Sequence, residues 1–482
     1  MNILEKLKGL GFDTVPEEFY KQNVDVWQAW YEGKVNAFHK YKLYNGKKYV
    51  RLERFSVGMG KKVCEDWANL LMNERVKITL EGKEEQEFFD AVCKDNNFAV
   101  KANEMQEKKA ALGTGAYVFT VTGVEVDEET GAVGNGREIK LDYVAGRKII
   151  PLSWDNGIIK ECAFAIEKTI KGKTYVYVQI HHLNERGEYD IDNVIYEKNN
   201  DNLSDVELTD VAGFENIPPT VHTGSKERQF VIDRMNIANN TTVSDNPLGV
   251  SVFANAIDQL KAVDIVYDSY VTEFVLGKKR VMIKPSAMQS IDGEPAFDTN
   301  DVVFYLMPED SKDDSMIHEI NMNLRTGELN GGMQDMLNVL STKCGFGEKH
   351  YKFDGGSVAT ATQIVSENST LFRTIKKHEI ILEDVLKEIA QIILRLGNTY
   401  LGKSLDENVE ISIDFDDSII EDKATEFQRD MTMLSAGILN PYEFRMKWLN
   451  EDEETAKEAL PQMEALVGNE PGAEGSEVGA DE

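Results

Sequence analysis

The stretch NPLGVSVFANAIDQLKAVDIVYDSYVTEFVLGKKR, residues 246–280, decides how we expect this chain to fold. Asn246 and Pro247 are typical of a helix N-cap and first turn, and Gly277 is typical of a helix end. Between these signals, apolar side chains recur at three- and four-residue steps: Val250, Phe253, Ile257, Leu260, Tyr267, Val271 and Phe274. The spacing predicts a first long helix within 246–277, roughly 36–40 Å in length.

Asp264 interrupts this apolar stripe at a position where another apolar residue was due. A helix of this length usually packs lengthwise against equally long partners. Because a lone subunit cannot bury the stripe, we expect neighbouring copies of the chain to cover it. Asp264 would then pair with a neighbour's basic side chain or face a central channel. The predicted intersubunit stripe consists of Phe253, Ile257, Leu260, Asp264, Tyr267 and Phe274.

The residues after the helix predict an excursion that leaves the body and returns. Lys278, Lys279 and Arg280 form a basic cluster. Residues 278–325 contain short strand candidates, turns and an acidic loop, and residues 326–344 predict a second helix. A helix that leaves, a β insertion and a helix that returns form a stalk that carries a knob.

A loop bracketed by glycines follows, over residues 345–357, and opens into another long helix. We predict this helix over 358–397, from apolar residues seven apart, with Gly397 as its end. A strand candidate at 409–415 and helices near 421–435 and 441–465 come next, and we expect the acidic tail 466–482 to be disordered. The loop interleaves basic and aromatic side chains: Lys349, His350, Tyr351, Lys352 and Phe353.

The first half of the chain changes its hydrophobic period near residue 113. Residues 1–112 are mostly helical in pattern, whereas residues 113–235 alternate apolar and polar side chains as strands do. Asn156 and Gly157 are typical of a tight turn between two strands. Because helices and strands occupy separate regions, the sequence predicts an α+β fold instead of an alternating βαβ array.

The formal net charge of −31 limits the partners of the chain. A protein that grips DNA through its phosphates carries basic patches, so this chain either avoids nucleic acid or contacts it weakly. No apolar run is long enough to span a membrane and no secretory signal is present, so we expect the protein to stay in the cytoplasm. Four cysteines lack the spacing of a zinc or disulfide framework and predict reduced thiols: Cys64, Cys93, Cys162 and Cys344.

No segment predicts catalytic chemistry or a cofactor, so we expect a protein that is not an enzyme. The segment 58–62 lacks the hydroxyl residue of a phosphate-binding loop because Val63 takes that position. The histidines show no metal-ligand spacing, and no nucleophile motif accompanies them. Asp414, Asp416 and Asp417 could hold a divalent cation. Acidic residues between a strand end and a helix start are explained more simply by the helix dipole.

Six segments occur in an order that a known family shares: 54–71, 151–157 (PLSWDNG), 246–258, 273–280, 353–369 (FDGGSVATATQIVSENS) and 373–378. In this order they resemble the wing, the first stem helix, the tunnel loop and the following helix of phage portal proteins. The resemblance is greatest to the portal, or minor capsid, proteins of siphophages of Gram-positive hosts. It runs from about residue 10 to residue 465.

The resemblance implies a cyclic homo-oligomer of about twelve copies that replaces one capsid vertex of the virion and is assembled in the host cytoplasm. Double-stranded DNA would pass through its channel during packaging and ejection. The partners that the resemblance implies are the terminase large subunit, the major capsid or scaffolding protein and the head–tail connector. It also implies a portal fold divided into a wing (1–245 with 358–416), a stem (246–277 and 326–344), a clip (278–325), a tunnel loop (345–357) and a crown (417–465).

Particular residues match the family's DNA-facing positions. Carried over to this chain, the tunnel-loop positions are Lys349, His350, Tyr351, Lys352 and Phe353, and the positions at the end of the stem are Lys278, Lys279 and Arg280. In a ring, each group would be repeated once per subunit and form a belt of positive charge.

Two other functions remain open from sequence. One is a different phage structural protein, such as a capsid or baseplate component, which would lack a central hole. The other is a metal-dependent nuclease that uses Asp414, Asp416 and Asp417.

Overall fold

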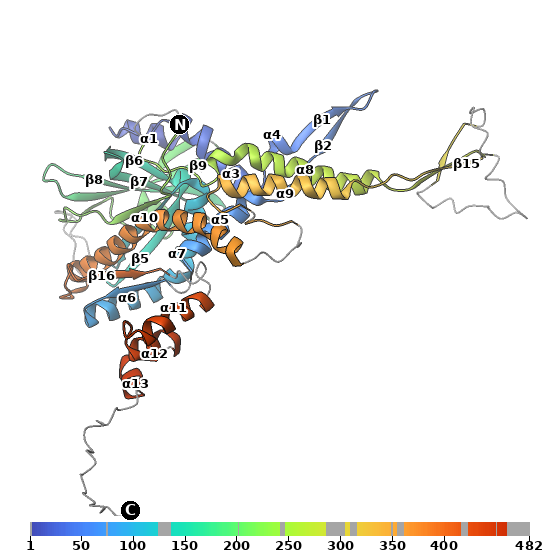
Figure 1. Cartoon of the computed structure of the whole chain (residues 1–482). Coiled ribbons are helices and arrows are strands. Elements are labelled where there is room, and N and C mark those ends of the chain that lie inside the picture. Colours follow the sequence, from blue (N-terminus) through green and yellow to red (C-terminus); the bar gives the residue numbers. More distant parts are fainter. Residues whose placement is uncertain are drawn as a thin grey trace, which may run out of the picture. The chain divides into compact units, whose positions relative to one another are not determined.

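The computed structural model of the chain describes residues 2–73, 76–123, 136–200, 202–241, 246–285, 304–308, 316–348, 350–353, 361–415, 423–449 and 451–459. These residues form two compact units, Met1–Asp416 and Asp417–Glu482. Helices and mainly antiparallel sheets alternate in blocks along the chain and not as βαβ units, which confirms the predicted α+β class (Figure 1). No helix within the described ranges has the length and hydropathy to cross a membrane.

The first hundred residues are mostly helical, as predicted. Amphipathic spacing explains the helix Met59–Leu71, since Val63, Trp67 and Leu71 all lie on one face and are fully buried. The elements of this part are α1 (Ile3–Gly9), α2 (Glu17–Phe19), a π-helical turn (Tyr20–Val24), α3 (Asp25–Tyr31), α4 (Asn36–His39), β1 (Lys40–Tyr44), β2 (Tyr49–Glu53), α5 (Met59–Leu71), β3 (Lys77–Leu80), α6 (Lys83–Asp95) and α7 (Phe98–Leu112).

A β-rich block follows, as the change of period predicts. Its larger sheet is antiparallel in the order β10-β9-β8-β7-β6, with β11 also paired to β9, and a second sheet has the order β12-β4-β5. Asn156 and Gly157 both adopt positive φ and form the predicted turn between β6 and β7. The strands are β4 (Thr114–Thr122), β5 (Glu138–Ala145), β6 (Ile149–Asp155), β7 (Ile158–Ile170), β8 (Lys173–Leu183), β9 (Tyr189–Asn199), β10 (Asn202–Val206), β11 (Thr220–His222) and β12 (Phe230–Arg234).

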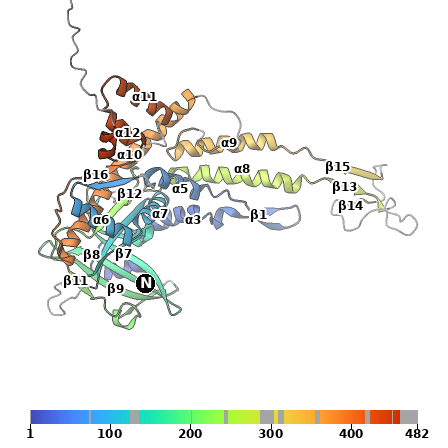
Figure 2. The same ribbon diagram turned by 90° about the horizontal axis from the view of Figure 1, so that it is seen from below.

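Two long helices, α8 (Ile257–Leu276) and α9 (Thr326–Lys343), lie side by side and leave the body together (Figures 1 and 2). They run antiparallel, because Arg325 before α9 forms a 2.8 Å ion pair with Glu273 near the end of α8. A small sheet of β13 (Arg280–Ile283), β14 (Phe304–Leu306) and β15 (Ile317–Ile320) joins their far ends. The predicted stalk and its β insertion are therefore present.

The first of these helices begins later than the sequence predicts. Asn246 and Pro247 do not start it, and the regular helix begins at Ile257. The preceding residues form a largely buried segment against α7 and β4, which ends in a short 3₁₀ helix (Ala254–Ala256). In this segment the Val252 amide donates to the carbonyl of Ala110 at 2.9 Å. Gly113 allows this close approach, because a Cβ there would lie 2.5 Å from the carbonyl oxygen of Gly249.

The helix α10 (Ala361–Leu401) is part of the core of the first unit. Its apolar stripe, which includes Leu382, Leu386 and Ile389, is fully buried. Gly397 does not end the helix as predicted. It allows close packing instead, because a Cβ would lie 2.6 Å from the ring of Phe88. The helix continues to Leu401, and β16 (Ile411–Asp414) then pairs antiparallel with β3.

The second unit consists of α11 (Lys423–Ser435), α12 (Pro441–Leu449) and α13 (Glu453–Glu458). Gly437, at positive φ, turns the chain between the first two helices. The rings of Phe427 and Trp448 lie 5.1 Å apart across these helices. The single helix predicted near 441–465 is wrong, because α12 ends at Leu449 and a new helix begins at Glu453 with Asp452 as its N-cap. Residues 460–465 and the tail 466–482 lie outside the described residues.

His181 on β8 predicts a pH-dependent stability. The ring is fully buried between Phe164 and Phe230, and neither ring nitrogen has a hydrogen-bond partner among the described residues. Burial lowers the pKa of His181 to about 3, from 6.5 in an unfolded chain. Between these values the unfolded chain binds a proton that the folded chain does not, so stability falls as pH falls. We expect His181→Phe to remove about 2 kcal/mol of the stability lost between pH 7 and pH 5, measured by urea unfolding.

His182, the next residue, provides a control of opposite sign. Its hydrogen bond to Asp192 raises the pKa of His182, so its contribution to stability is present at low pH and is lost as pH rises through the folded-state pKa. The variant His182→Gln should therefore lose more stability on acidification than the unsubstituted protein. Equal pH slopes for both variants and the unsubstituted protein would contradict the burial argument.

Candidate functional site

The segment between α9 and α10 is anchored in the first unit by aromatic packing. The ring of Phe346 is buried 5.0 Å from that of Trp67, and His350 stacks on Phe346 at 4.3 Å. The indole N–H of Trp67 also donates to the carbonyl of Cys344 at 3.0 Å. Phe346, at the start of the predicted tunnel loop, is therefore packed inside the subunit.

Tyr351 corrects one sequence prediction. The sequence suggests that it faces DNA, but its ring is buried within the subunit, 5.6 Å from the ring of Phe346. Burial, and then the nearby carboxylate of Asp66, raise the pKa of Tyr351 above its usual value. Alternation of basic and aromatic residues is equally compatible with an aromatic side chain that turns inward, and only the position of Phe346 and Trp67 decides between the two.

Gln334 of α9 holds the next residues of the segment. Its side-chain N–H donates to the carbonyl of Tyr351 at 2.8 Å, and its side-chain oxygen accepts from the amide of Phe353 at 2.8 Å. The ring of Phe353 then meets Tyr270 of α8 edge-on at 5.7 Å. These contacts place exposed Lys352 and Phe353 beside the two stem helices.

The predicted DNA-facing residues of this segment thus have different environments. His350, Lys352 and Phe353 are exposed, whereas Tyr351 is buried, and His350 also lies 3.8 Å from the carboxylate of Asp66. Burial alone would raise the pKa of Asp66, but hydrogen bonds from His350 and Lys62 outweigh it, and the pKa of Asp66 is lowered. Lys349 and residues 354–360 lie outside the described residues.

The basic cluster after α8 is largely exposed, but two of its three side chains have partners within the subunit. Lys279 forms a 3.0 Å ion pair with Glu319 on β15, and the guanidinium of Arg280 donates to the carbonyl of Leu276 at 3.2 Å. Lys278 is exposed to solvent. The contribution of this cluster to a basic belt remains a prediction.

The predicted intersubunit stripe is wrong for the residues nearest the body. Phe253 and Leu260 are fully buried inside their own subunit, and Ile257 and Tyr267 are partly buried. Only Phe274, at the far end, is widely exposed, at 45%. Sequence periodicity detects the apolar stripe but does not identify what packs on it. Near the body, other segments of the same chain cover the stripe.

The prediction for Asp264 is also wrong, because its side chain neither faces a channel nor needs a basic partner from a neighbouring copy. It is 3% exposed, and its carboxylate accepts from the amide of Val57 at 2.8 Å and from the hydroxyl of Ser56 at 3.0 Å. The Nε2 atom of His39 lies 3.0 Å from the same carboxylate. The sequence pattern around Asp264 gives no indication of these partners, which belong to the first sixty residues of the chain.

The apolar surface that remains uncovered lies at the far end of the stalk. On α8 it consists of Phe274, Val275 and Leu276, and on the small sheet it continues through Leu306, which is 69% exposed, and Ile317. Scattered exposed apolar residues are ordinary, but a group on adjoining elements marks an interaction surface. This end of the stalk is the strongest candidate for contact with other molecules.

The acidic cluster proposed for a metal is not assembled by the described residues. Asp414 lies at the end of β16, opposite Lys77 on β3, and Asp416 and Asp417 lie outside the described residues. No group of three His, Cys, Asp or Glu side chains in the described part of the chain could hold a metal ion.

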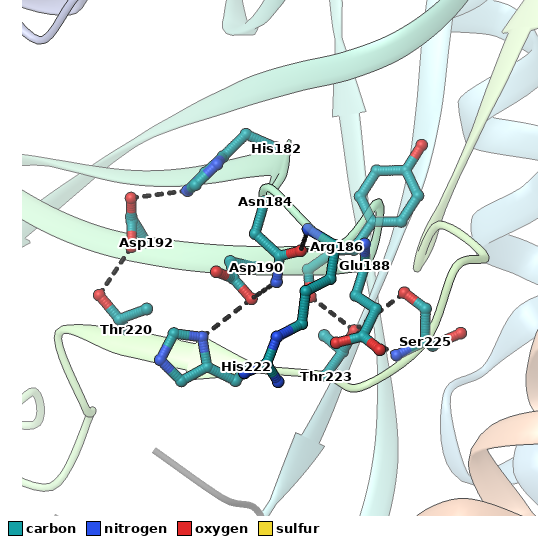
Figure 3. A network of polar contacts seen from close by, with 11 residues as sticks. His182, Asn184, Arg186, Glu188, Asp190, Asp192, Thr220, His222, Thr223 and Ser225 are labelled. Carbon is teal, nitrogen blue, oxygen red and sulfur yellow. Dashed lines mark hydrogen bonds and ion pairs between the residues drawn. The ribbon is translucent and has the colours of Figure 1, made fainter. Parts of the chain in front are cut away.

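Histidine–aspartate pairs do occur, in a network around the β8–β9 hairpin that no sequence spacing indicated (Figure 3). His182 contacts Asp192 at 2.8 Å, and the hydroxyl of Thr220 donates to the other oxygen of Asp192 at 2.7 Å. His222 on β11 contacts Asp190 at 2.9 Å. Because each contact joins β11 or β8 to β9, the network holds these strands together.

Comparison with known proteins gives a family and similar solved structures. Residues 17–465 match the family model described as "Phage portal protein, SPP1 Gp6-like". A chain of the structure described as "Virion of native gene transfer agent (GTA) particle" is similar to this chain, with a TM-score of 0.35 and 11% sequence identity. The similarity covers 80% of this chain and 88% of that one. No curated protein matches the chain.

Proposed function

This chain belongs to the SPP1 Gp6-like family of phage portal proteins, and we propose that it assembles into a closed ring of about twelve copies at one capsid vertex. It is a structural protein of a phage particle. In this proposal, the ring admits DNA during packaging and releases it at ejection. Its outer surface binds the capsid or scaffolding protein, and the stalk ends bind the terminase large subunit and later the head–tail connector.

The uncovered apolar end of the stalk is the observation that carries this proposal. Phe274, Leu306 and Ile317 remain exposed there, on a helix end and on a sheet too small to bury them. Burial of such side chains stabilises association by about 25 cal/mol per Å² of apolar surface. Copies arranged about a common axis would bring these ends together and bury them.

We assign the parts of the ring as follows. The helices α8 and α9 form the stem, and the small sheet between them forms the clip. The segment 345–357 forms the tunnel loop, and the second unit forms the crown. The remaining helices and sheets of the first unit form the wing.

Weak contact with DNA follows from the charge of the chain. A net charge of −31 per subunit repels phosphates, while exposed Lys352 and Lys278 attract them at two levels of the proposed channel. Each contact is weak and screened by salt, so DNA can be guided without being held.

Negative-stain electron microscopy of the purified protein tests the ring. We expect closed rings with a central opening. Monomers or open sheets would contradict the portal assignment of function, and discs without an opening would indicate another structural role.

Neutralising the tunnel-loop lysines should affect DNA and leave assembly intact. In the variant with Lys349→Ala and Lys352→Ala, we expect normal rings but altered retention of packaged DNA, because one basic belt is lost from every subunit. Retention can be measured as DNA released from filled heads against salt concentration. The matched control replaces two exposed lysines of the wing, Lys83→Ala and Lys173→Ala, and should leave retention unchanged. Loss of rings in the first variant would show that these lysines hold the subunit together.

A further inference from the structure

The hairpin of β1 and β2, with the residue that follows it (40–54), has two chemically different faces. We call residues 40–54 the arm. In its antiparallel register, Tyr41 pairs with Leu52 and Leu43 pairs with Val50, so these four apolar side chains share one face. Lys42 pairs with Arg51 and Lys40 pairs with Glu53 on the opposite face. Tyr44 pairs with Tyr49 on that same opposite face, near the tip. One face is therefore apolar, and the other is mainly basic with a tyrosine pair at its end.

The described residues of the subunit cover little of the apolar face. Leu43 is 57% exposed and Leu52 is 37% exposed, whereas Tyr41 and Val50 are partly buried. The two strands extend away from α3 and α4 and are joined to no other sheet (Figures 1 and 2). A two-stranded ribbon is marginally stable in water unless something packs on its apolar face.

The base of the arm is nevertheless fixed in direction. Asp264 of α8 accepts hydrogen bonds from residues just after the arm and contacts His39 just before it, and one turn later Asp268 accepts from the amide of Phe55. The amide of Arg54 also donates to the carbonyl of His39 at 2.8 Å, which closes the base. The guanidinium of Arg54 lies 4.2 Å from the ring centre of Tyr41. A fixed base and an uncovered apolar face are the properties of a docking element.

The charge of the arm identifies the kind of partner. Residues 40–54 contain six basic residues and one acidic residue, a net charge of +5. Since the whole chain carries −31, its other residues carry −36. A second copy of this chain therefore offers an acidic surface to the basic face of the arm. DNA would satisfy the basic face but would leave Leu43 and Leu52 in water.

We propose that the arm packs on the neighbouring copy of this chain, with its apolar face buried against that copy, and so fastens adjacent subunits of the ring. The proposal rests on the ring proposed above. It predicts that the arm's apolar side chains strengthen assembly, and that the basic side chains do so in a salt-dependent way.

The test compares assembly of the full chain with that of arm variants by mass photometry over a range of protein concentrations. We expect Leu43→Ser with Leu52→Ser to raise the concentration for half-assembly about tenfold or more, since two leucines per interface lose their burial. Lys42→Gln with Arg51→Gln should weaken assembly at low salt and have less effect at high salt. The control Ile158→Ser removes a side chain with 60% exposure from another hairpin and should change nothing.

A cross-linking experiment keeps the proposal testable if the leucine variant folds poorly. A photoreactive benzoylphenylalanine replacing Leu43, on the apolar face, should give covalent chain–chain products, and the same group at Ile158 should give none. Rings of unchanged stability in the arm variants, or no chain–chain product from position 43, would overturn the arm proposal but not the proposed ring. Rings that persist but lose DNA would identify DNA as the occupant and would also overturn it. Unsubstituted protein that stays monomeric would overturn the ring itself.

Discussion

Replacing Asp233 with leucine is expected to lower the free energy of unfolding by about 3–5 kcal/mol, because it leaves a buried ammonium group without its counter-charge. Asp233 on β12 and Lys109 on α7 are both fully buried and form a 2.9 Å ion pair. The other carboxylate oxygen of Asp233 accepts from the side-chain amide of Gln106 at 2.7 Å. Urea unfolding at one fixed protein concentration would measure the loss, since oligomerisation makes apparent stability concentration-dependent.

Two controls separate a buried charge from a merely lost contact. The double variant Asp233→Leu with Lys109→Met removes both charges and should recover much of the loss. The variant Glu87→Ala removes an exposed partner of Lys83, and its ion pair should contribute little. If the single and double variants were equally destabilised, the cost would lie in packing and not in the unpaired ammonium.

Asp264→Ala is the second substitution from which we expect a large effect. It removes the acceptor of the Val57 amide and the Ser56 hydroxyl and leaves the buried ring of His39 without its carboxylate contact. Unsatisfied buried groups cost about 1–3 kcal/mol each, so we expect stability to fall by about 3 kcal/mol or more. Because the same carboxylate holds the base of the arm, trypsin should also cut at Arg54 or within the arm faster than in the unsubstituted protein.

Asp268→Ala is the matched comparison one turn further along α8. It removes a single exposed hydrogen bond, from the amide of Phe55, and should cost about 1 kcal/mol or less. Equal losses for the two variants, or unchanged cleavage of the arm after Asp264→Ala, would show that Asp264 does not fasten the arm to α8.

Local pattern was sufficient to predict most kinds of element and their order, but not the hairpin of β1 and β2, which lies in the part predicted to be mostly helical. The three- and four-residue spacing between Val250 and Phe274 indicated a long helix, and the change of period near residue 113 indicated strands. The stalk with its β insertion followed from the same patterns. These features depend on interactions between residues close in sequence, so they can be predicted without knowledge of the tertiary structure.

The same reasoning predicted the ends of the helices less well. Gly397 has the residue type of a helix end, yet it packs under Phe88 inside α10. Asn246 and Pro247 have the types of a helix start, yet the chain there is held against α7 until residue 257. In both places a contact with a distant element outweighs the local preference of the residue.

The sequence by itself determined that an apolar helix with one acidic interruption leads into a basic cluster and a small β insertion. Only the tertiary structure decided what covers that helix. Phe253 and Leu260 are buried by their own chain, and Asp264 binds residues more than 200 positions away, such as His39. The physical reason is that periodicity records which face of a helix avoids water, whereas the identity of its cover depends on distant segments that only the fold brings together. The uncovered apolar residues at the end of the stalk and on the arm became visible for the same reason.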